Sequence, residues 1–267
     1  MRALAKTHLP APVLQGCRIA RSLFDFDFWH LRAFSAARLL RLRSKYKGER
    51  CFIIGNGPSL NNTDLTLLKN EITFGLNRIY LLFEKMGFHT TYHVCVNPLV
   101  IEQCARDIEA LPMPRFISWH CRKIVQRSPG MMFIGDPYDR PLGFSKTPIT
   151  RIWEGSTVTY VAMQLAYYLG FKQVVLVGVD HRFVTEGPPH AAVTSAGGDP
   201  DHFDPAYFGN GFRWNLPDLN TSEAAYRLAK STFEADGREI IDATVGGRLS
   251  VFRRVPYESL FDRSIRS

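Results

Sequence analysis

Residues able to hold a nucleotide follow several apolar segments of the sequence. The run 51–54 leads into Gly55-Asn56-Gly57-Pro58-Ser59, and three later apolar runs end at Asn77, Asn97 and Asp180. Glycine lets a ligand approach bare backbone, and Pro58 suits a helix start, where free N–H groups attract phosphate. The asparagine amides suit a ribose or a pyrimidine edge, although asparagine also favours turns without any ligand. We expect nucleotide binding by Gly55, Asn56, Gly57, Ser59, Asn77, Asn97 and Asp180.

The two best-known phosphate loops do not match this stretch. A dinucleotide fingerprint requires a third glycine where this chain has Leu60, and a Walker A loop requires a lysine soon after Gly57. The loop therefore predicts a nucleotide, but neither NAD nor the ATP of a P-loop enzyme.

A second phosphate candidate is Ser156-Thr157, which follows Gly155 and precedes a predicted helix. Two hydroxyls and the free N–H groups of a helix start would converge on an anion. An ordinary N-cap is the alternative explanation. The Gly-x-Ser-x-Gly pattern of a nucleophile elbow is absent, so we do not expect a serine hydrolase.

The segment 182–218 is long, irregular and rich in Gly, Pro, Asp and aromatic residues, as in a loop that closes over a substrate. His202 is the candidate general base, because histidine exchanges protons near neutral pH. Tyr207 and Asn210 complete the predicted catalytic group. Alternatively, His202 is an exposed loop residue without a catalytic role. Mg²⁺ could instead be held by Asp180, Asp199, Asp201, His202 and Asp204, but we assign no metal site.

Strands alternate with helices through most of the chain, which predicts an α/β fold with a Rossmann-like, doubly wound, mostly parallel sheet. The predicted strands are 51–54, 72–76, 91–96, 116–118, 131–134, 173–179 and 239–243, and the main helices are 78–86, 99–110, 158–169 and 222–236. We expect a basic helical segment at 1–48, loosely ordered over 1–16, and a nucleotide-binding, transferase-like domain at 49–267 with a lid at 182–218.

The net charge of +8 resides in the first 50 residues, which contain eleven Lys/Arg and three Asp/Glu. Apolar residues recur at helical spacing over 29–46, so residues 17–47 could pack on the body, self-associate or lie on an anionic membrane. No reading motif for nucleic acid occurs. The absence of long apolar runs and of paired cysteine motifs predicts a cytoplasmic protein. Such a protein could still bind to the inner face of the membrane.

The motifs resemble those of two related groups. Gly55 to Leu60, the strands that end in Asn and Asn-Pro, the stretch 202–209 and Trp214 are similar to the MptE-like family, named for an archaeal 6-hydroxymethylpterin diphosphokinase. The likeness covers roughly 49–261 and extends to bacterial CMP-sialic-acid-dependent sialyltransferases of the Campylobacter lipooligosaccharide type. In those transferases a histidine follows Tyr-x-Gly, whereas here Tyr207-Phe208-Gly209 is followed by Asn210, which cannot accept a proton.

The resemblance implies a nucleotide-dependent transferase fold, for which we consider three functions. In the first, a CMP-activated acidic sugar is the donor and a surface glycan the acceptor. Asn56 and Gly57 would then contact CMP, Asn77 and Asn97 the cytidine and ribose, and Ser156 or Thr157 a phosphate or sugar carboxylate. The second is diphosphate transfer from ATP with Mg²⁺ to a hydroxymethylpterin. The third is a nucleotide-binding protein of a glycan locus that lacks catalysis. None implies a tightly bound cofactor.

Overall fold

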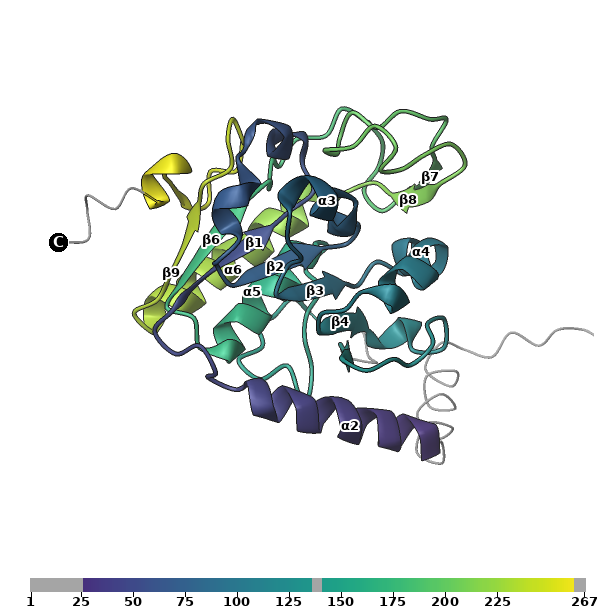
Figure 1. Cartoon of the computed structure of the whole chain (residues 1–267), viewed down its shortest axis with the longest axis vertical. Helices are drawn as coiled ribbons and strands as arrows, with labels where there is room; N and C mark the ends of the chain where they lie inside the picture. The colour runs from purple at the N-terminus through teal and green to yellow at the C-terminus, as the bar shows by residue number, and fades with distance from the viewer. Residues whose placement is uncertain (1–25, 136–140, 262–267) are drawn as a thin grey trace, which may run out of the picture.

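A parallel sheet of eight strands forms the centre of the protein (Figure 1). The computed structural model describes residues 26–135 and 141–261, so the prediction for residues 1–16 lies outside the described part. Along the sheet the strands are β10 (Arg253–Arg254), β9 (Glu239–Asp242), β6 (Gln173–Val177), β1 (Arg50–Ile54), β2 (Thr73–Leu76), β3 (Tyr92–Cys95), β4 (Arg115–Ser118) and β5 (Met131–Ile134). Every neighbouring pair is parallel, which confirms the predicted fold class.

Both faces of the sheet are buried. Successive strand residues point to opposite sides, and the side chains on both sides belong to apolar clusters. Cys51 and Ile53 belong to one apolar cluster, whereas Phe52 and Ile54 belong to the other. The strands therefore read as continuous apolar runs, as parallel strands covered by helices do. The helices are α2 (Phe26–Leu42), α3 (Phe83–Met86), α4 (Pro98–Ala110), α5 (Val158–Leu169) and α6 (Leu219–Ala235).

Helix α5 is the most completely buried of the described helices. Every residue from Thr159 to Leu169 is buried, which explains why its sequence is apolar all round. Thr157 caps it by accepting a hydrogen bond from the Thr159 N–H at 3.3 Å, and Gly170 ends it with a left-handed φ of 95°. The rigid start of α5 is thereby fixed at the edge of the sheet.

Short 3-10 helices replace some of the predicted helical structure. They are η1 (Pro58–Asn62), η2 (Leu65–Leu68), η3 (Ile79–Leu82), η4 (Trp119–Cys121) and η5 (Glu258–Leu260). The sequence predicts a short helix that Asn61 or Asn62 caps and that runs through Leu68, where the structure has η2 with Asp64 as its cap. The predicted helix 78–86 is split into η3 and α3.

The segment 182–218 is less irregular than its composition indicates. It contains an antiparallel pair of short strands, β7 (Ala192–Thr194) and β8 (Arg213–Asn215). Helix α6 begins at Leu219, three residues earlier than predicted, because Asp218 caps it by accepting from the Thr221 N–H at 2.9 Å.

Helix α2 lies along the lower edge in Figure 1 and covers the outer strand β5. Leu31, Ser35 and Leu39, spaced four residues apart, are its buried side chains. The Ser35 hydroxyl also accepts a hydrogen bond from the Phe133 N–H at 3.0 Å. Among the described residues, no helix combines the length and apolarity needed to cross a bilayer.

Candidate nucleotide site

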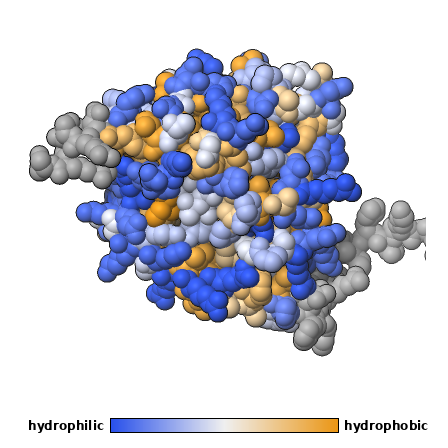
Figure 2. Space-filling view, in the orientation of Figure 1, coloured by the Kyte–Doolittle hydropathy of each residue, from blue (hydrophilic) through white to orange (hydrophobic). Residues whose placement is uncertain are grey.

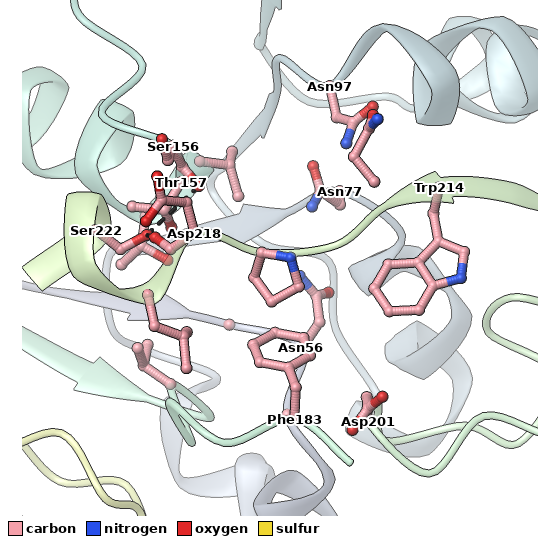
Figure 3. A pocket seen from close by; sticks show the side chains of 18 of the residues that line it. Asn56, Asn77, Asn97, Ser156, Thr157, Phe183, Asp201, Trp214, Asp218 and Ser222 are labelled. Atoms are coloured by element: carbon pink, nitrogen blue, oxygen red, sulfur yellow. Dashed lines mark hydrogen bonds between the residues drawn. The ribbon is translucent and has the colours of Figure 1, made fainter. Parts of the chain in front are cut away.

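A cavity of about 600 Å³ opens beyond the carboxyl ends of the strands. Strands β1 and β6 are neighbours here, although the chain runs from β1 to β5 on one side and continues from β6 on the other. This reversal of strand order is where open α/β sheets bind ligands. Figure 3 shows Asn56, Asn77 and Asn97 facing the cavity across from Ser156 and Thr157.

The glycine loop after β1 serves close packing more than left-handed backbone. Neither Gly55 nor Gly57 has positive φ, so neither is needed for a left-handed turn. A Cβ on Gly55 would lie 2.3 Å from the Gly178 carbonyl oxygen, and one on Gly57 would lie 1.8 Å from an Asp180 carboxylate oxygen. The glycines thus let the ends of β1 and β6 meet.

The N–H groups of this loop are also used within the protein. Gly55 and Gly57 donate to the carbonyls of Val177 and Gly178, at 2.8 and 2.9 Å. Ser59 donates its N–H and its hydroxyl to Asp180, at 3.1 and 2.6 Å. The N–H groups of Gly55, Gly57 and Ser59 are therefore not available to a phosphate, contrary to the prediction for this loop. The Asn56 side chain is the main group left for a ligand.

Two asparagine side chains have polar atoms without a protein partner. The Oδ1 atoms of Asn56 and Asn77 are buried and accept no hydrogen bond from any described residue. Buried acceptors that stay empty cost about 1–3 kcal/mol each, so a ligand that donates to them is favoured. Exocyclic amines and sugar hydroxyls are such donors.

The backbone of Asn77 is held in position by His93 of the neighbouring strand β3. Its backbone is left-handed, with φ of 47°, and its carbonyl lies 2.6 Å from His93 Nε2. Burial within β3 lowers the pKa of His93 to about 4, so the ring is neutral and Nε2 carries the proton it donates. His93 therefore fixes the Asn77 backbone at the end of β2, from which the side chain reaches the cavity.

Asn97 has a structural role that the sequence left open. Its Oδ1 accepts from the N–H groups of Leu99 and Val100, at 2.9 and 3.4 Å, and so caps α4. The amide nitrogen of Asn97 remains as a donor at the cavity wall. Asn97 thus offers a donor where Asn56 and Asn77 offer acceptors.

The starts of two helices form the opposite wall. Ser156 and Thr157 precede α5, while Asp218 and Ser222 belong to the start of α6. Figure 3 shows these four side chains grouped together. Thr157 lies 3.2 Å from the Tyr226 hydroxyl, in addition to capping α5. The positive end of the α5 dipole faces the cavity beside hydroxyl groups, which suits an anion.

His202 lies at the cavity with its ring fixed on two sides. Its Nδ1 is 2.9 Å from both carboxylate oxygens of Asp199, and its ring stacks on Tyr207 at 4.0 Å between centroids. A carboxylate at Nδ1 holds the proton there, so Nε2 is the nitrogen that can accept one. Asp199 also accepts from the Phe208 N–H at 3.1 Å, which anchors the pair to the loop.

Four carboxylates line the cavity, and they differ in their partners. Asp180, Asp201 and Asp218 each accept from backbone N–H groups and hydroxyls, whereas the one described group that donates to the Glu154 carboxylate is the Ser118 hydroxyl, at 3.4 Å. Desolvation raises the pKa of Glu154. Within residues 26–135 and 141–261, no three His, Cys, Asp or Glu side chains gather as metal ligands would.

Most of the predicted site residues share this cavity. Those that line it are Gly55, Asn56, Gly57, Asn77, Asn97, Ser156, Thr157, Asp180 and His202. Three others do not line it. Ser59 donates a hydrogen bond to Asp180 but does not itself line the cavity. Tyr207 is buried and stacks on the His202 ring. Asn210 is exposed near Gly197.

Several cavity residues were not predicted. Phe183 and Trp214 form apolar walls, and Glu154 closes the side near α5. The sequence offers no signal for Phe183 beyond its place in the aromatic loop, whereas Trp214 belongs to the motif shared with the MptE-like family. Asp199, which the sequence offers as a metal ligand, contacts His202 Nδ1 in the structure.

The chain resembles one protein family and, among solved structures, a glycosyltransferase. The family of 6-hydroxymethylpterin diphosphokinase MptE-like proteins matches residues 31–186. The structure of the MAf glycosyltransferase from Magnetospirillum magneticum AMB-1 matches with a TM-score of 0.51 and 13% identity, over 86% of this chain and 39% of that chain. This likeness shows the fold alone, and the present chain spans less than half of that protein. A comparison with curated proteins gave no match.

The family match confirms one part of the sequence-based resemblance. It covers more than half of the chain, including β1 to β6 and most of the asparagine-bearing strand ends. This protein therefore belongs to the 6-hydroxymethylpterin diphosphokinase MptE-like family.

Proposed function

We propose that this protein transfers an acidic sugar from a CMP-activated donor to a surface-glycan acceptor. A transferase-like function is supported by membership in a family named for a diphosphokinase, since a diphosphokinase is itself a transferase. The observation that supports a nucleotide ligand is the pair of buried, unpartnered Oδ1 atoms on Asn56 and Asn77. They favour a ligand with an amine and hydroxyls, as cytidine has.

The dimensions of the cavity support the same donor. A volume of about 600 Å³ falls in the range that encloses a small ligand. The asparagines would hold the nucleoside, and the phosphate would lie at the α5 start, near Ser156 and Thr157. The sugar and its acceptor would then lie toward the segment that contains His202.

His202 is the proposed general base for the acceptor hydroxyl. Asp199 orients the ring and would stabilise the positive charge that forms when Nε2 takes the proton. The acceptor oxygen would attack the anomeric carbon as the bond to the CMP phosphate breaks, and CMP would leave with the bonding electrons. Asn210 lies away from the cavity, so its inability to accept a proton does not remove this base.

Calorimetric titration separates this donor from the alternatives. We expect CMP to bind without Mg²⁺, and Asn56→Leu to lower the CMP affinity at least tenfold by removing the Oδ1 that accepts from the ligand. Asn61→Leu is a matched control, because Asn61 bonds the Phe203 carbonyl outside the cavity. Absence of affinity for any cytidine nucleotide would rule the proposal out.

A turnover assay tests the catalytic assignment separately. His202→Gln should keep the CMP affinity within about threefold and reduce transfer by roughly 10²-fold or more, the usual contribution of a general base. Asp199→Asn should reduce transfer by a smaller factor, because the ring remains but its orientation is weakened. Full transfer activity in His202→Gln would show that another group accepts the proton.

Diphosphate transfer to a hydroxymethylpterin is the second candidate. The family name favours it, and Phe183 and Trp214 offer apolar walls to a flat ring. Binding of ATP that requires Mg²⁺, without binding of CMP, would select it. CMP binding without any turnover would instead select a nucleotide-binding protein that lacks catalysis.

A further inference from the structure

A second surface stands out at α2, away from the nucleotide cavity. We define the α2 face as the outward side of α2, the turn 43–48 and the loop 119–129. The two segments touch, since the Arg32 guanidinium lies 4.5 Å from the centre of the Trp119 ring. They also share a recess of about 250 Å³, which has Leu31 and Phe133 in its wall beside Arg38 and Arg127.

The outward side of α2 carries large apolar side chains. Trp29 and Leu40 are 53% and 56% exposed, although helices of folded proteins usually turn such residues inward. They are eleven residues apart, so at about 100° per residue they lie within roughly 20° of each other around the helix. Ala33 and Ala37 lie between them and are exposed. This stripe is opposite the buried residues of α2.

The same face is strongly basic. Residues 26–48 contain six Lys/Arg and one Asp, and residues 119–129 contain three Lys/Arg and no Asp or Glu. Arg41, Arg43 and Lys45 are exposed, and no carboxylate of the described residues forms an ion pair with them. Figure 2, oriented as Figure 1, shows hydrophilic and hydrophobic residues interspersed along this lower edge.

We propose that the α2 face binds the surface of an anionic bilayer. Exposed Trp29 and Leu40 would enter the boundary between head groups and acyl chains. Arg41, Arg43 and Lys45 would pair with lipid phosphates. A nucleic acid would use the cations but leave Leu40 without a partner, because leucine offers no ring to stack on a base. A second copy would bring two basic faces together, and their like charges repel.

Vesicle flotation of the full-length protein tests this proposal. We expect it to float with phosphatidylcholine vesicles that contain about a quarter phosphatidylglycerol, but not with phosphatidylcholine alone. Binding should fall when salt rises from about 0.1 M to about 0.5 M, because screening weakens exposed charges. Arg41→Glu with Arg43→Glu should weaken binding at least tenfold, at about 1 kcal/mol for each basic residue lost.

Two controls separate the surface from folding and net charge. Lys69→Glu with Lys85→Glu changes the net charge equally at exposed sites outside the α2 face, and should leave flotation unchanged. Leu40→Ser should weaken binding without changing any charge. All variants should keep the thermal unfolding transition of the unchanged protein.

Other results would overturn the membrane assignment. Equal loss of flotation in the Lys69 and Lys85 variant would show that net charge alone is responsible. A dimer in sedimentation, without vesicle binding, would assign the face to a second copy. Release from vesicles by an oligonucleotide at equal phosphate concentration would assign it to nucleic acid. None of these readouts depends on the proposed transferase activity.

Discussion

Asn77 concentrates the features of a ligand-binding residue in one position. Its backbone has φ of 47°, and its side-chain oxygen is buried without a partner. A left-handed asparagine is tolerated better than most residues, yet it still costs free energy relative to glycine. The protein thus keeps a side chain where glycine would fit the backbone better, which favours a role for the amide.

Asn77→Gly separates the backbone from the amide. Glycine accepts the positive φ, so the free energy of unfolding should stay the same or rise by up to about 1 kcal/mol. CMP affinity should fall roughly tenfold, because a hydrogen bond to the ligand is lost. Calorimetry and urea unfolding measure the two effects. Unchanged affinity would mean that the Asn77 amide does not touch the ligand.

His93 predicts a pH dependence of stability. Its pKa is about 4 in the folded protein and near 6.5 when exposed, so only the unfolded chain takes up a proton between these values. Stability should therefore fall as pH decreases from about 6.5 to 4, by up to about 3 kcal/mol from this group. Urea unfolding at several pH values measures it.

His93→Gln is the matched control, because glutamine can donate to the Asn77 carbonyl but does not titrate. Its stability should depend less on pH over the same interval, with the difference growing toward acid. Identical profiles for the two proteins would show that His93 is protonated in the folded state.

The sequence could indicate Asn77 but not His93. Asn77 directly follows an apolar run, and a polar residue in that place points to the end of a parallel strand. His93 lies inside β3, where only the pairing of β3 with β2 brings it under Asn77. Side-chain partners between strands depend on register, which the hydrophobic pattern does not reveal.

At the scale of elements, the junction of β1 and β6 holds the cavity together. Asp180 bonds Ser59 while its carboxylate lies against Gly57, so the loops after the two strands pack as one unit. The sequence indicated that glycine was required here but not why. The neighbour that excludes a Cβ comes from a strand more than 120 residues later, and local pattern cannot identify it.

Gly57→Ala tests this packing. The added methyl group would lie 1.8 Å from an Asp180 oxygen, so we expect a loss of about 2–4 kcal/mol in unfolding free energy. Asp180→Ala removes the obstacle, so the double variant should lose less than the sum of the single variants by at least about 1 kcal/mol. Additive losses, measured by urea unfolding, would show that the contact does not determine the glycine.

At the scale of the whole molecule, the cavity joins two groups of elements. Alternating runs of strand and helix predicted the parallel sheet, and the asparagines and the Ser156-Thr157 pair were expected to meet at its carboxyl edge. The packing of 182–218 could not be predicted, because that segment has no periodic pattern. Its residues His202, Phe183 and Trp214 reach the cavity because the segment contacts the loops after β1 and β2, as well as α4.

A ligand that spans the cavity should therefore stiffen both groups together. CMP would touch the loops after β1 and β2 through its nucleoside and the starts of α5 and α6 through its phosphate. We expect slower amide hydrogen exchange on both walls and in 182–218, by roughly tenfold at a CMP concentration about ten times the dissociation constant. Cytidine, which lacks the phosphate, is the matched comparison and should protect the asparagine loops but not the α5 start. If CMP and cytidine protect the same amides, the phosphate does not lie at α5, and the α5 start has another ligand or only a capping role.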